Sequence, residues 1–136
     1  MAADKLELEI TTPERLVLSE TVDEVVLPGK VGYLGVLPGH APLLTSLAEG
    51  EVSYRVGNRW TYLAVSTGFV EVLDSRVGVL ADTCERAGEI DVDRAERARQ
   101  GAQEAIRRQD AENELREANA RLRRAVTRID VSRRQR

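Results

Sequence analysis

The spacing of apolar residues along the chain changes near residue 90, and this change restricts the fold more than any other feature. Before it, apolar and polar residues alternate, as at Leu6, Leu8 and Ile10. After it, apolar residues recur every three or four positions. Alternation predicts strands that bury one face, whereas the longer spacing predicts helices. We therefore expect an α+β chain, with a β-rich half followed by a helical half.

Turn-forming residues divide the first half into short segments. They lie at Pro28-Gly29, Pro38-Gly39, Gly57-Asn58 and Asp74-Ser75, between the alternating runs. This spacing predicts roughly eight to ten short strands that form a β-sandwich or flattened barrel. Gly57-Asn58 is the clearest hairpin signal, because both residues tolerate the positive φ that tight hairpin turns require.

The second half carries two apolar series at helical spacing. The first is Val92, Ala95, Ala98, Ala102, Ala105 and Ile106, and the second is Leu115, Ala118, Leu122, Ala125, Val126 and Ile129. Packed against each other, two such helices form an antiparallel hairpin. The seam is mostly alanine, and each buried methyl contributes only about 0.8 kcal/mol. The hairpin is therefore expected to be only marginally stable by itself.

The connection between the helices, residues 107–112, contains neither glycine nor proline, and Asp110 is its only plausible N-cap. Nothing in it forbids a continuous helix. Residues 91–129 are therefore expected to form either a folded hairpin or a longer, extended arrangement, as in a bistable element.

Composition restricts the class of protein. The chain has 136 residues, 42% hydrophobic and 32% charged, which is typical of one soluble domain with an appendage. No apolar run reaches the roughly 18 to 20 residues that a membrane-spanning helix needs. The N-terminus lacks the features of a secretory or transit peptide, so a cytoplasmic location is expected. The single cysteine, Cys84, is expected to be a core residue, and it forms neither a disulfide nor a metal site.

Charge is distributed unevenly along the chain. Residues 1–89 contain 14 acidic and 7 basic side chains, whereas residues 90–136 contain 9 acidic and 13 basic ones. The cationic second half is expected to meet an acidic partner surface or an anionic ligand. Nucleic acid is a poorer candidate, because acidic residues interleave with the basic ones and no aromatic platform accompanies them.

The glycine- and proline-rich run 32–44 is the most unusual segment, and it contains the only histidine, His40. Its order does not match GxxxxGK[ST], so a phosphate loop is disfavoured and a rigid surface loop is predicted. His40 has no nucleophile or orienting acid beside it, so a structural hydrogen-bonding role is expected. We identify no catalytic residues and no metal-ligand cluster in the sequence.

The run GYLGVLPGHAPLLTSLAEG at residues 32–50 resembles the signature stretch of ATP synthase epsilon subunits. The openings LELEITTPERLVLSE and VDEVVLPG resemble the first strands of the same family, and the resemblance extends over essentially the whole chain. It implies a rotor-docking β-sandwich domain at residues 1–88 and a regulatory helix-turn-helix domain at residues 89–136. The implied protein is a non-catalytic central-stalk subunit of a bacterial F-type ATP synthase, which couples proton translocation to ATP synthesis.

The same resemblance implies partners and a location. The β-sandwich is expected to touch the gamma subunit and the c-subunit ring, with Tyr33, Leu34, Pro38 and His40 at the rotor interface. The complex places such a subunit peripherally, at the cytoplasmic face of the cell membrane. No cofactor is required. The residues alone leave an alternative open, which is a β-sandwich and coiled-coil adaptor of some other complex.

In this family the helical hairpin can extend along gamma toward the alpha and beta subunits and inhibit ATP hydrolysis. The expected inhibitory contacts are Arg107, Arg108, Arg121 and Arg123, whose charge suits an acidic partner segment.

Residues 90–95, IDVDRA, resemble the (I/L)DxxRA motif with which some bacterial epsilon subunits bind ATP. The resemblance implies ATP as a regulatory ligand, held by Glu85, Ile90, Asp91, Arg94, Ala95, Arg124 and Arg128. Gly101 stands where nucleotide-binding relatives have a basic residue, which weakens phosphate contact and costs the helix about 1 kcal/mol. The alternative is an ordinary capped helix start with an exposed arginine.

Overall fold

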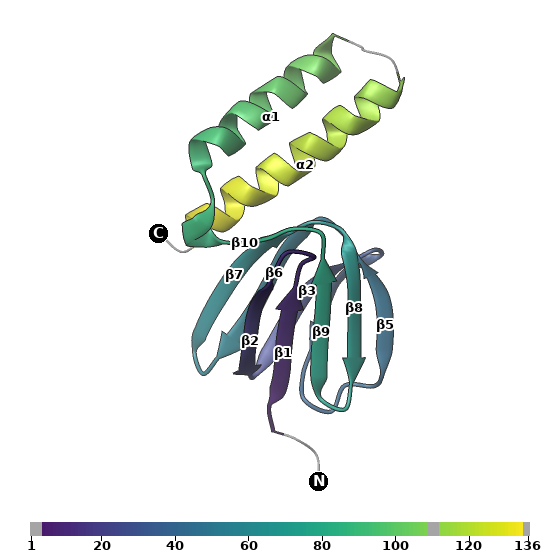
Figure 1. The fold of residues 1–136 in the computed structure, drawn as a ribbon, viewed down its shortest axis with the longest axis vertical. Coiled ribbons are helices and arrows are strands. Elements are labelled where there is room, and N and C mark those ends of the chain that lie inside the picture. The colour runs from purple at the N-terminus through teal and green to yellow at the C-terminus, as the bar shows by residue number, and fades with distance from the viewer. Residues whose placement is uncertain (1–3, 109–111, 135–136) are drawn as a thin grey trace.

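The computed structural model describes residues 4–108 and 112–134, which form a β-body followed by two helices (Figure 1). The first five strands are β1 (Leu6–Thr11), β2 (Leu16–Val22), β3 (Glu24–Gly29), β4 (Gly32–Val36) and β5 (Leu43–Leu47). The next five are β6 (Gly50–Val56), β7 (Arg59–Val65), β8 (Gly68–Leu73), β9 (Arg76–Ala81) and β10 (Cys84–Arg86). A short 3₁₀ turn, η1 (Ala87–Glu89), leads to α1 (Val92–Arg107) and α2 (Glu112–Arg134).

The strands form one curled sheet in the order β10-β7-β6-β3-β5-β8-β9-β1-β2, and β4 pairs with β3 beside this path. The pairings are antiparallel except that of β1 with β9, which is parallel. The sheet folds back on itself into a flattened barrel, with the helices at one end (Figure 1). The predicted β-sandwich followed by a helical hairpin is confirmed.

The core of the body comes directly from the alternation in the sequence. In β1 every second residue is buried, at Leu6, Leu8 and Ile10. The neighbouring β9 buries Val77 and Val79 in the same way. Because successive side chains of a strand point to opposite faces, these residues fill the space between the two layers of the barrel. Cys84 belongs to the same core, as expected.

The predicted Gly57-Asn58 hairpin is present as the two-residue turn between β6 and β7, where Val56 pairs with Arg59. Gly57 adopts φ +63°, and its N–H donates to Asp23 Oδ2 at 2.7 Å. The Lys5 ammonium also binds Asp23, and together with the Gly57 N–H it lowers the pKa of that carboxyl. The turn is therefore tied to the N-terminal strand region as well as to its own hairpin.

Asp91 forms the N-cap of α1, because its Oδ1 accepts the backbone N–H of Arg94 at 3.0 Å. The helix therefore starts where the sequence predicted. α2 continues to Arg134, five residues beyond the predicted end at Ile129, because Val131 is fully buried against the body. Asp110, the predicted N-cap of the second helix, lies outside the described residues.

Alanines form the contact between the two antiparallel helices (Figure 1), as predicted. The buried positions are Ala95, Ala102 and Ala105 of α1, and Ala118, Ala125 and Ile129 of α2. The prediction is wrong for two residues expected in this contact, Ala98 and Val126, because both are exposed. The seam is narrow, so Ala98 and Val126 fall on its flanks, where the surfaces of the two helices curve away from each other.

Candidate functional site

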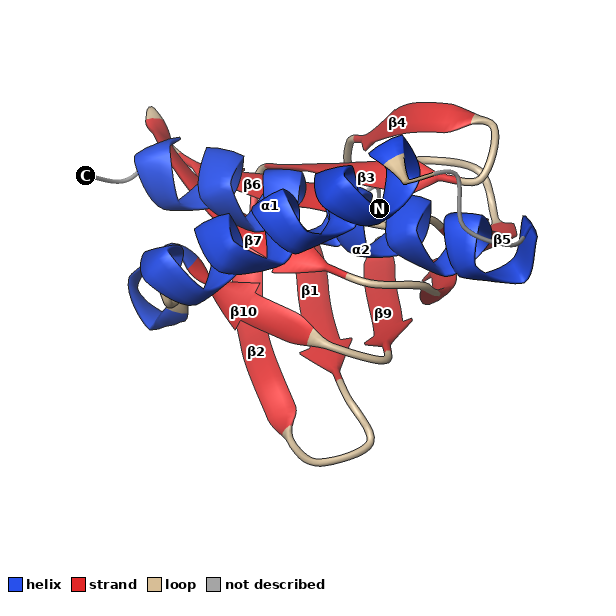
Figure 2. Cartoon of the chain, turned by 90° about the horizontal axis from the view of Figure 1, so that it is seen from above, coloured by secondary structure: helices blue, strands red, loops and turns tan. Residues whose placement is uncertain are grey.

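The helical hairpin rests on one end of the β-body mainly through α2, which contacts β6, β7 and η1 (Figures 1 and 2). The apolar part of this contact is small. Ala64 of β7, Ile90 before α1 and Val131 of α2 form a buried cluster, flanked by Tyr62 and Ala87. Burial of so few side chains provides only modest stabilisation.

Arg128 of α2 makes the most enclosed polar contact between the hairpin and the body. Its Nε lies 2.6 Å from Glu85 Oε1, and its Nη2 donates to Glu85 Oε2 at 2.9 Å. Both side chains are largely shielded from solvent, at 21% and 30% exposed. The Nη2 donation is the directional part of this contact, because the Nε pairs with Glu85 by charge but has no hydrogen-bond partner among the described residues. This hydrogen bond helps to position α2 over β10.

Two further ion pairs join α2 to the body. Arg124 Nη1 donates to Glu49 Oε1 at 3.1 Å, and Arg134 Nε donates to Glu51 Oε2 at 2.8 Å. The Arg134 guanidinium also lies 5.1 Å from the centre of the Tyr62 ring, as a cation–π contact. Docking of the hairpin therefore combines a small apolar contact with three charge pairs, and such pairs weaken with salt.

A cleft of about 450 Å³ lies between the hairpin and the edge of the sheet. Arg94 and Ala98 of α1 line one side, and Arg121, Arg124 and Arg128 of α2 line another. The rest is lined by Thr12, Glu14, Arg15 and residues 82–85 of the body. Five arginines and three acidic side chains surround this space, so its walls carry excess positive charge.

The cleft brings together four of the seven residues expected to bind ATP, namely Glu85, Arg94, Arg124 and Arg128. The other three have structural positions. Ile90 is buried in the apolar cluster under α2, Asp91 caps α1 through its side chain, and Ala95 is buried in the helix seam. Arg121, expected only as an inhibitory contact, also lines the cleft.

The four residues expected at the rotor interface lie along β4 and the turn that follows it. Tyr33 is 62% exposed, and its hydroxyl accepts the Glu51 N–H at 3.1 Å. His40 Nδ1 lies 2.7 Å from the carbonyl oxygen of Ala41, so the ring is engaged with its own loop. Leu34 and Pro38 are half-buried.

The four expected inhibitory arginines do not form one patch in the folded hairpin. Arg107 and Arg108 lie at the C-terminal end of α1, far along the hairpin from the body (Figure 1). Arg121 lines the cationic cleft, whereas Arg123 borders a separate groove on another side of α2.

The body has an exposed apolar face that was not predicted from the sequence. Leu44, Phe69 and Leu80, on β5, β8 and β9, are 70%, 57% and 52% exposed. The strand register places Phe69 opposite Leu80 on the next strand. A signal was present in the sequence, because Phe69-Val70 and Val79-Leu80 are apolar at consecutive positions, where a half-buried strand should alternate.

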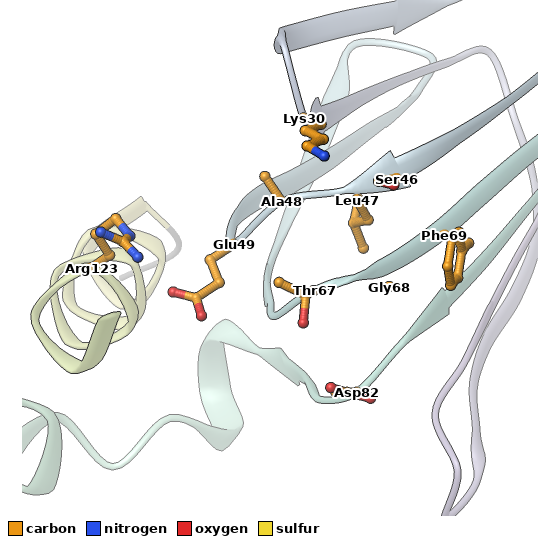
Figure 3. A pocket seen from close by; sticks show the side chains of 10 residues that line it. All are labelled: Lys30, Ser46, Leu47, Ala48, Glu49, Thr67, Gly68, Phe69, Asp82 and Arg123. Carbon is orange, nitrogen blue, oxygen red and sulfur yellow. The ribbon is translucent and has the colours of Figure 1, made fainter. Parts of the chain in front are cut away.

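A groove of about 620 Å³ adjoins this face, at the boundary between the body and α2 (Figure 3). Leu47 and Phe69 contribute apolar side chains to it, and Lys30 and Arg123 stand on its borders. The groove therefore connects the exposed face of the body to α2.

The described part of the chain contains no group of three or more His, Cys, Asp or Glu side chains that could hold a metal ion. Within the same residues, neither helix is both long and apolar enough to cross a membrane.

Two protein-family descriptions match the chain, one for each half. "ATP synthase, Delta/Epsilon chain, beta-sandwich domain" matches residues 5–87, and "ATP synthase, Delta/Epsilon chain, long alpha-helix domain" matches residues 89–133. The ATP synthase epsilon chain of Syntrophobacter fumaroxidans is 47% identical over 130 residues, which is 96% of this chain and 97% of that one. ATP synthase epsilon chain 2 of Syntrophotalea carbinolica is 49% identical over 131 residues, 96% and 95% of the two chains.

Solved structures share the fold. A chain of the Euglena gracilis mitochondrial ATP synthase matches with a TM-score of 0.81 and 23% identity, over 90% of this chain and 78% of that one. A chain from the central stalk and c-ring of the Tetrahymena thermophila enzyme matches with a TM-score of 0.66 and 15% identity, over 97% and 99%. With both halves matched in order and close relatives covered almost end to end, the chain belongs to the ATP synthase delta/epsilon family, as an epsilon chain.

Proposed function

We propose that this chain is a non-catalytic rotor subunit in the central stalk of a bacterial F-type ATP synthase. Residues 1–88 dock on the rotor, and residues 89–136 act as a regulatory arm that inhibits ATP hydrolysis. The subunit thereby helps to couple proton translocation to ATP synthesis, peripherally at the cytoplasmic face of the cell membrane. One observation carries this proposal: the chain aligns over 96% of its length with epsilon chains that are 47% and 49% identical to it.

The exposed apolar face of β5, β8 and β9 is the proposed docking surface for the gamma subunit. Leu44, Phe69 and Leu80 stand on paired strands of a rigid sheet, and exposed large apolar side chains gathered on one face mark an interaction site. Tyr33, Leu34, Pro38 and His40, on β4 and its following turn, are proposed to extend the rotor contact, including that with the c-ring.

The arm is proposed to leave the body when a competing partner offers its arginines other carboxylates. Its docking depends on three Arg–Glu pairs and a small apolar cluster, so a modest competing interaction is sufficient to release it. Once extended, Arg107, Arg108, Arg121 and Arg123 are proposed to face acidic segments of the beta and alpha subunits. ATP bound in the cationic cleft would favour the folded arm, as a regulatory ligand and not as a substrate.

Docking is tested by capture of the full-length chain on purified gamma subunit. Phe69→Asp should weaken capture at least about tenfold, because it places a carboxylate in a desolvated apolar contact. Val56→Asp is the matched control, since Val56 is 44% exposed on a different part of the body. Equal capture of the two variants would exclude the β5-β8-β9 face, and no capture of wild type would refute the rotor assignment.

The brake is tested with the assembled enzyme carrying a chain truncated at residue 89. Capture by gamma should persist, because the body has its own core, whereas ATP hydrolysis should rise. Unchanged hydrolysis would remove the inhibitory role and leave the family assignment standing.

A further inference from the structure

Tyr33 of β4 lies between the proposed rotor contact and the regulatory arm. The residue is 62% exposed, and its exposed surface belongs to the set proposed above to meet the rotor. Its hydroxyl reaches the body, where it accepts the backbone N–H of Glu51 at 3.1 Å. The Glu51 carboxylate in turn accepts from Nε of Arg134, in the last turn of α2, at 2.8 Å. Glu51 therefore contacts both Tyr33 and the arm.

The Tyr33 hydroxyl takes the place of a strand partner for the start of β6. Within the described strands, the pairing of β3 with β6 ends at Val26 and Ser53, before Glu51 is reached. A backbone N–H beyond the end of the pairing needs another acceptor, and the hydroxyl supplies it. Gly50 permits this approach, because a Cβ on it would lie 2.8 Å from the hydroxyl oxygen. Tyr33 therefore helps to fix the backbone from which the Glu51 side chain extends.

Two neighbouring strands hold the Arg134 guanidinium. Glu51 of β6 binds it through a side chain that is only 18% exposed, and the Tyr62 ring of β7 lies with its centre 5.1 Å from it. The carboxylate and the ring can hold one guanidinium together only while the start of β6 keeps its place beside β7. A hydrogen bond that fixes Glu51 therefore also supports the docking of α2.

We propose that Tyr33 is a positioning residue for the regulatory arm, and that a rotor surface covering its ring holds the arm more firmly in the folded state. This inference rests on the proposed rotor contact at Tyr33 and adds a coupling between that contact and the arm. An exposed ring can leave its hydrogen bond by changing rotamer, whereas a ring covered by a partner is restricted to one rotamer. The partner thereby keeps the Glu51 N–H paired and the carboxylate in place for Arg134.

The coupling is expected to be weak and reciprocal. Arg134 is 53% exposed, and ion pairs of this kind change an equilibrium by about two- to fivefold. By linkage, a folded arm strengthens the rotor contact by the same factor by which the rotor stabilises the folded arm. A coupling of this size adjusts the balance between the folded and extended arm without locking either.

The test of the positioning role is hydrogen exchange of α2 in the full-length chain. Tyr33→Phe removes the hydroxyl and keeps the ring, so exchange of amides 125–131 should rise about two- to fivefold while that of β1 stays unchanged. Tyr62→Phe is the matched control, because Tyr62 contacts Arg134 through its ring and loss of its hydroxyl should change little. Equal exchange of α2 in the two variants would overturn the positioning role.

A double variant shows whether the effect passes through Glu51. Tyr33→Phe combined with Arg134→Gln should exchange no faster than Arg134→Gln alone, because the ion pair that the hydroxyl positions is already lost. Effects that multiply would show that Tyr33 acts on the arm by some other route, and would also overturn the inference.

The coupling itself is measured with a purified rotor of gamma subunit and c-ring at saturating concentration. The rotor should slow exchange of amides 125–131 about two- to fivefold in wild type, and this slowing should be lost in Tyr33→Phe. Equal slowing in both chains, or none in a wild-type chain that binds the rotor, would refute the coupling and leave the rotor assignment standing. If wild type does not bind the rotor at all, the proposed function itself fails.

Discussion

At the scale of single residues, Gly68 has the least room for a side chain of any glycine in the chain. It opens β8 opposite Ala81 of β9, and a Cβ added there would lie 1.8 Å from the carbonyl oxygen of Leu80. Backbone cannot move aside as a flexible side chain can. Gly78, on the neighbouring strand, has open space around the corresponding position among the described residues. Glycine is therefore required at position 68 for steric reasons, whereas the space around position 78 can accommodate a side chain.

Gly68→Ala should lower the free energy of unfolding by at least about 2 kcal/mol, because the β8–β9 pairing must shift. Gly78→Ala should change it by less than about 1 kcal/mol and can even stabilise, since alanine restricts the unfolded chain. Urea denaturation of both variants measures the difference. Similar losses in the two would show that the contact at Leu80 relaxes easily.

Cys84 makes stability depend on pH at the alkaline end. Burial, with a smaller contribution from Glu89, raises the pKa of its thiol from an ordinary value of 9.0 to about 11. Between these values the unfolded state loses the proton while the folded state keeps it. The free energy of unfolding should therefore be unaffected by this thiol below pH 9 and fall as pH rises from 9 toward 11. Cys84→Ala should show a shallower fall over that range in denaturation curves, and an identical slope would contradict the burial effect.

At the scale of elements, the hairpin is built from good helix formers joined by a thin apolar seam. α1 contains one glycine, Gly101, in its interior, and it is exposed. Glycine in an exposed helix interior loses more backbone entropy than alanine does on folding. α1 therefore carries a local weakness about midway between its cap at Asp91 and its end at Arg107.

Gly101→Ala should stabilise α1 by about 1 kcal/mol. A Cβ at this position meets nothing within 4 Å in the described part of the chain, so no clash offsets the gain. Amide exchange of α1 should slow accordingly. Gln100→Ala, also exposed, is the control and should have a much smaller effect, because glutamine is already a good helix former. Unchanged exchange in Gly101→Ala would mean that α1 opens only together with the whole arm.

At the scale of the whole molecule, two differently stabilised parts are held together by a small apolar cluster and three ion pairs. The body has a continuous core of leucine and valine, whereas the arm meets it through Ile90, Val131 and three ion pairs. Opening of the interface is therefore expected to precede unfolding of the body, and to respond to ionic strength where the body does not.

Arg128→Gln should release the arm more often and leave the melting temperature of the body unchanged. It deprives Glu85 of its partner in a partly shielded site, at a cost of about 1 to 3 kcal/mol to docking. Proteolysis or hydrogen exchange at α2, compared with β1, measures the effect, and raising NaCl to about 0.5 M should partly reproduce it in wild type. Arg133→Gln, an exposed neighbour, is the control. Equal protection of α2 in both variants would refute charge-based docking.

The amino-acid sequence by itself determined the order and type of the elements. The period of two, the turn at Gly57 and the cap at Asp91 act between near neighbours in the chain, so they can be read without knowing the fold. The alanine seam was predicted in most of its members for the same reason. Arg94 and Arg128 could also be named as candidates from sequence spacing and family resemblance.

Only the tertiary structure decided which arginines are free and which are engaged. Arg128 and Glu85 are 43 residues apart in the chain, and Arg134 and Glu51 are 83 apart, so no local pattern pairs them. The exposure of Phe69 beside the buried Val70 likewise depends on how the sheet closes. Interactions between near neighbours in the chain specify strands and helices. Which arginines of the cleft form ion pairs is determined only when α2 packs against the body.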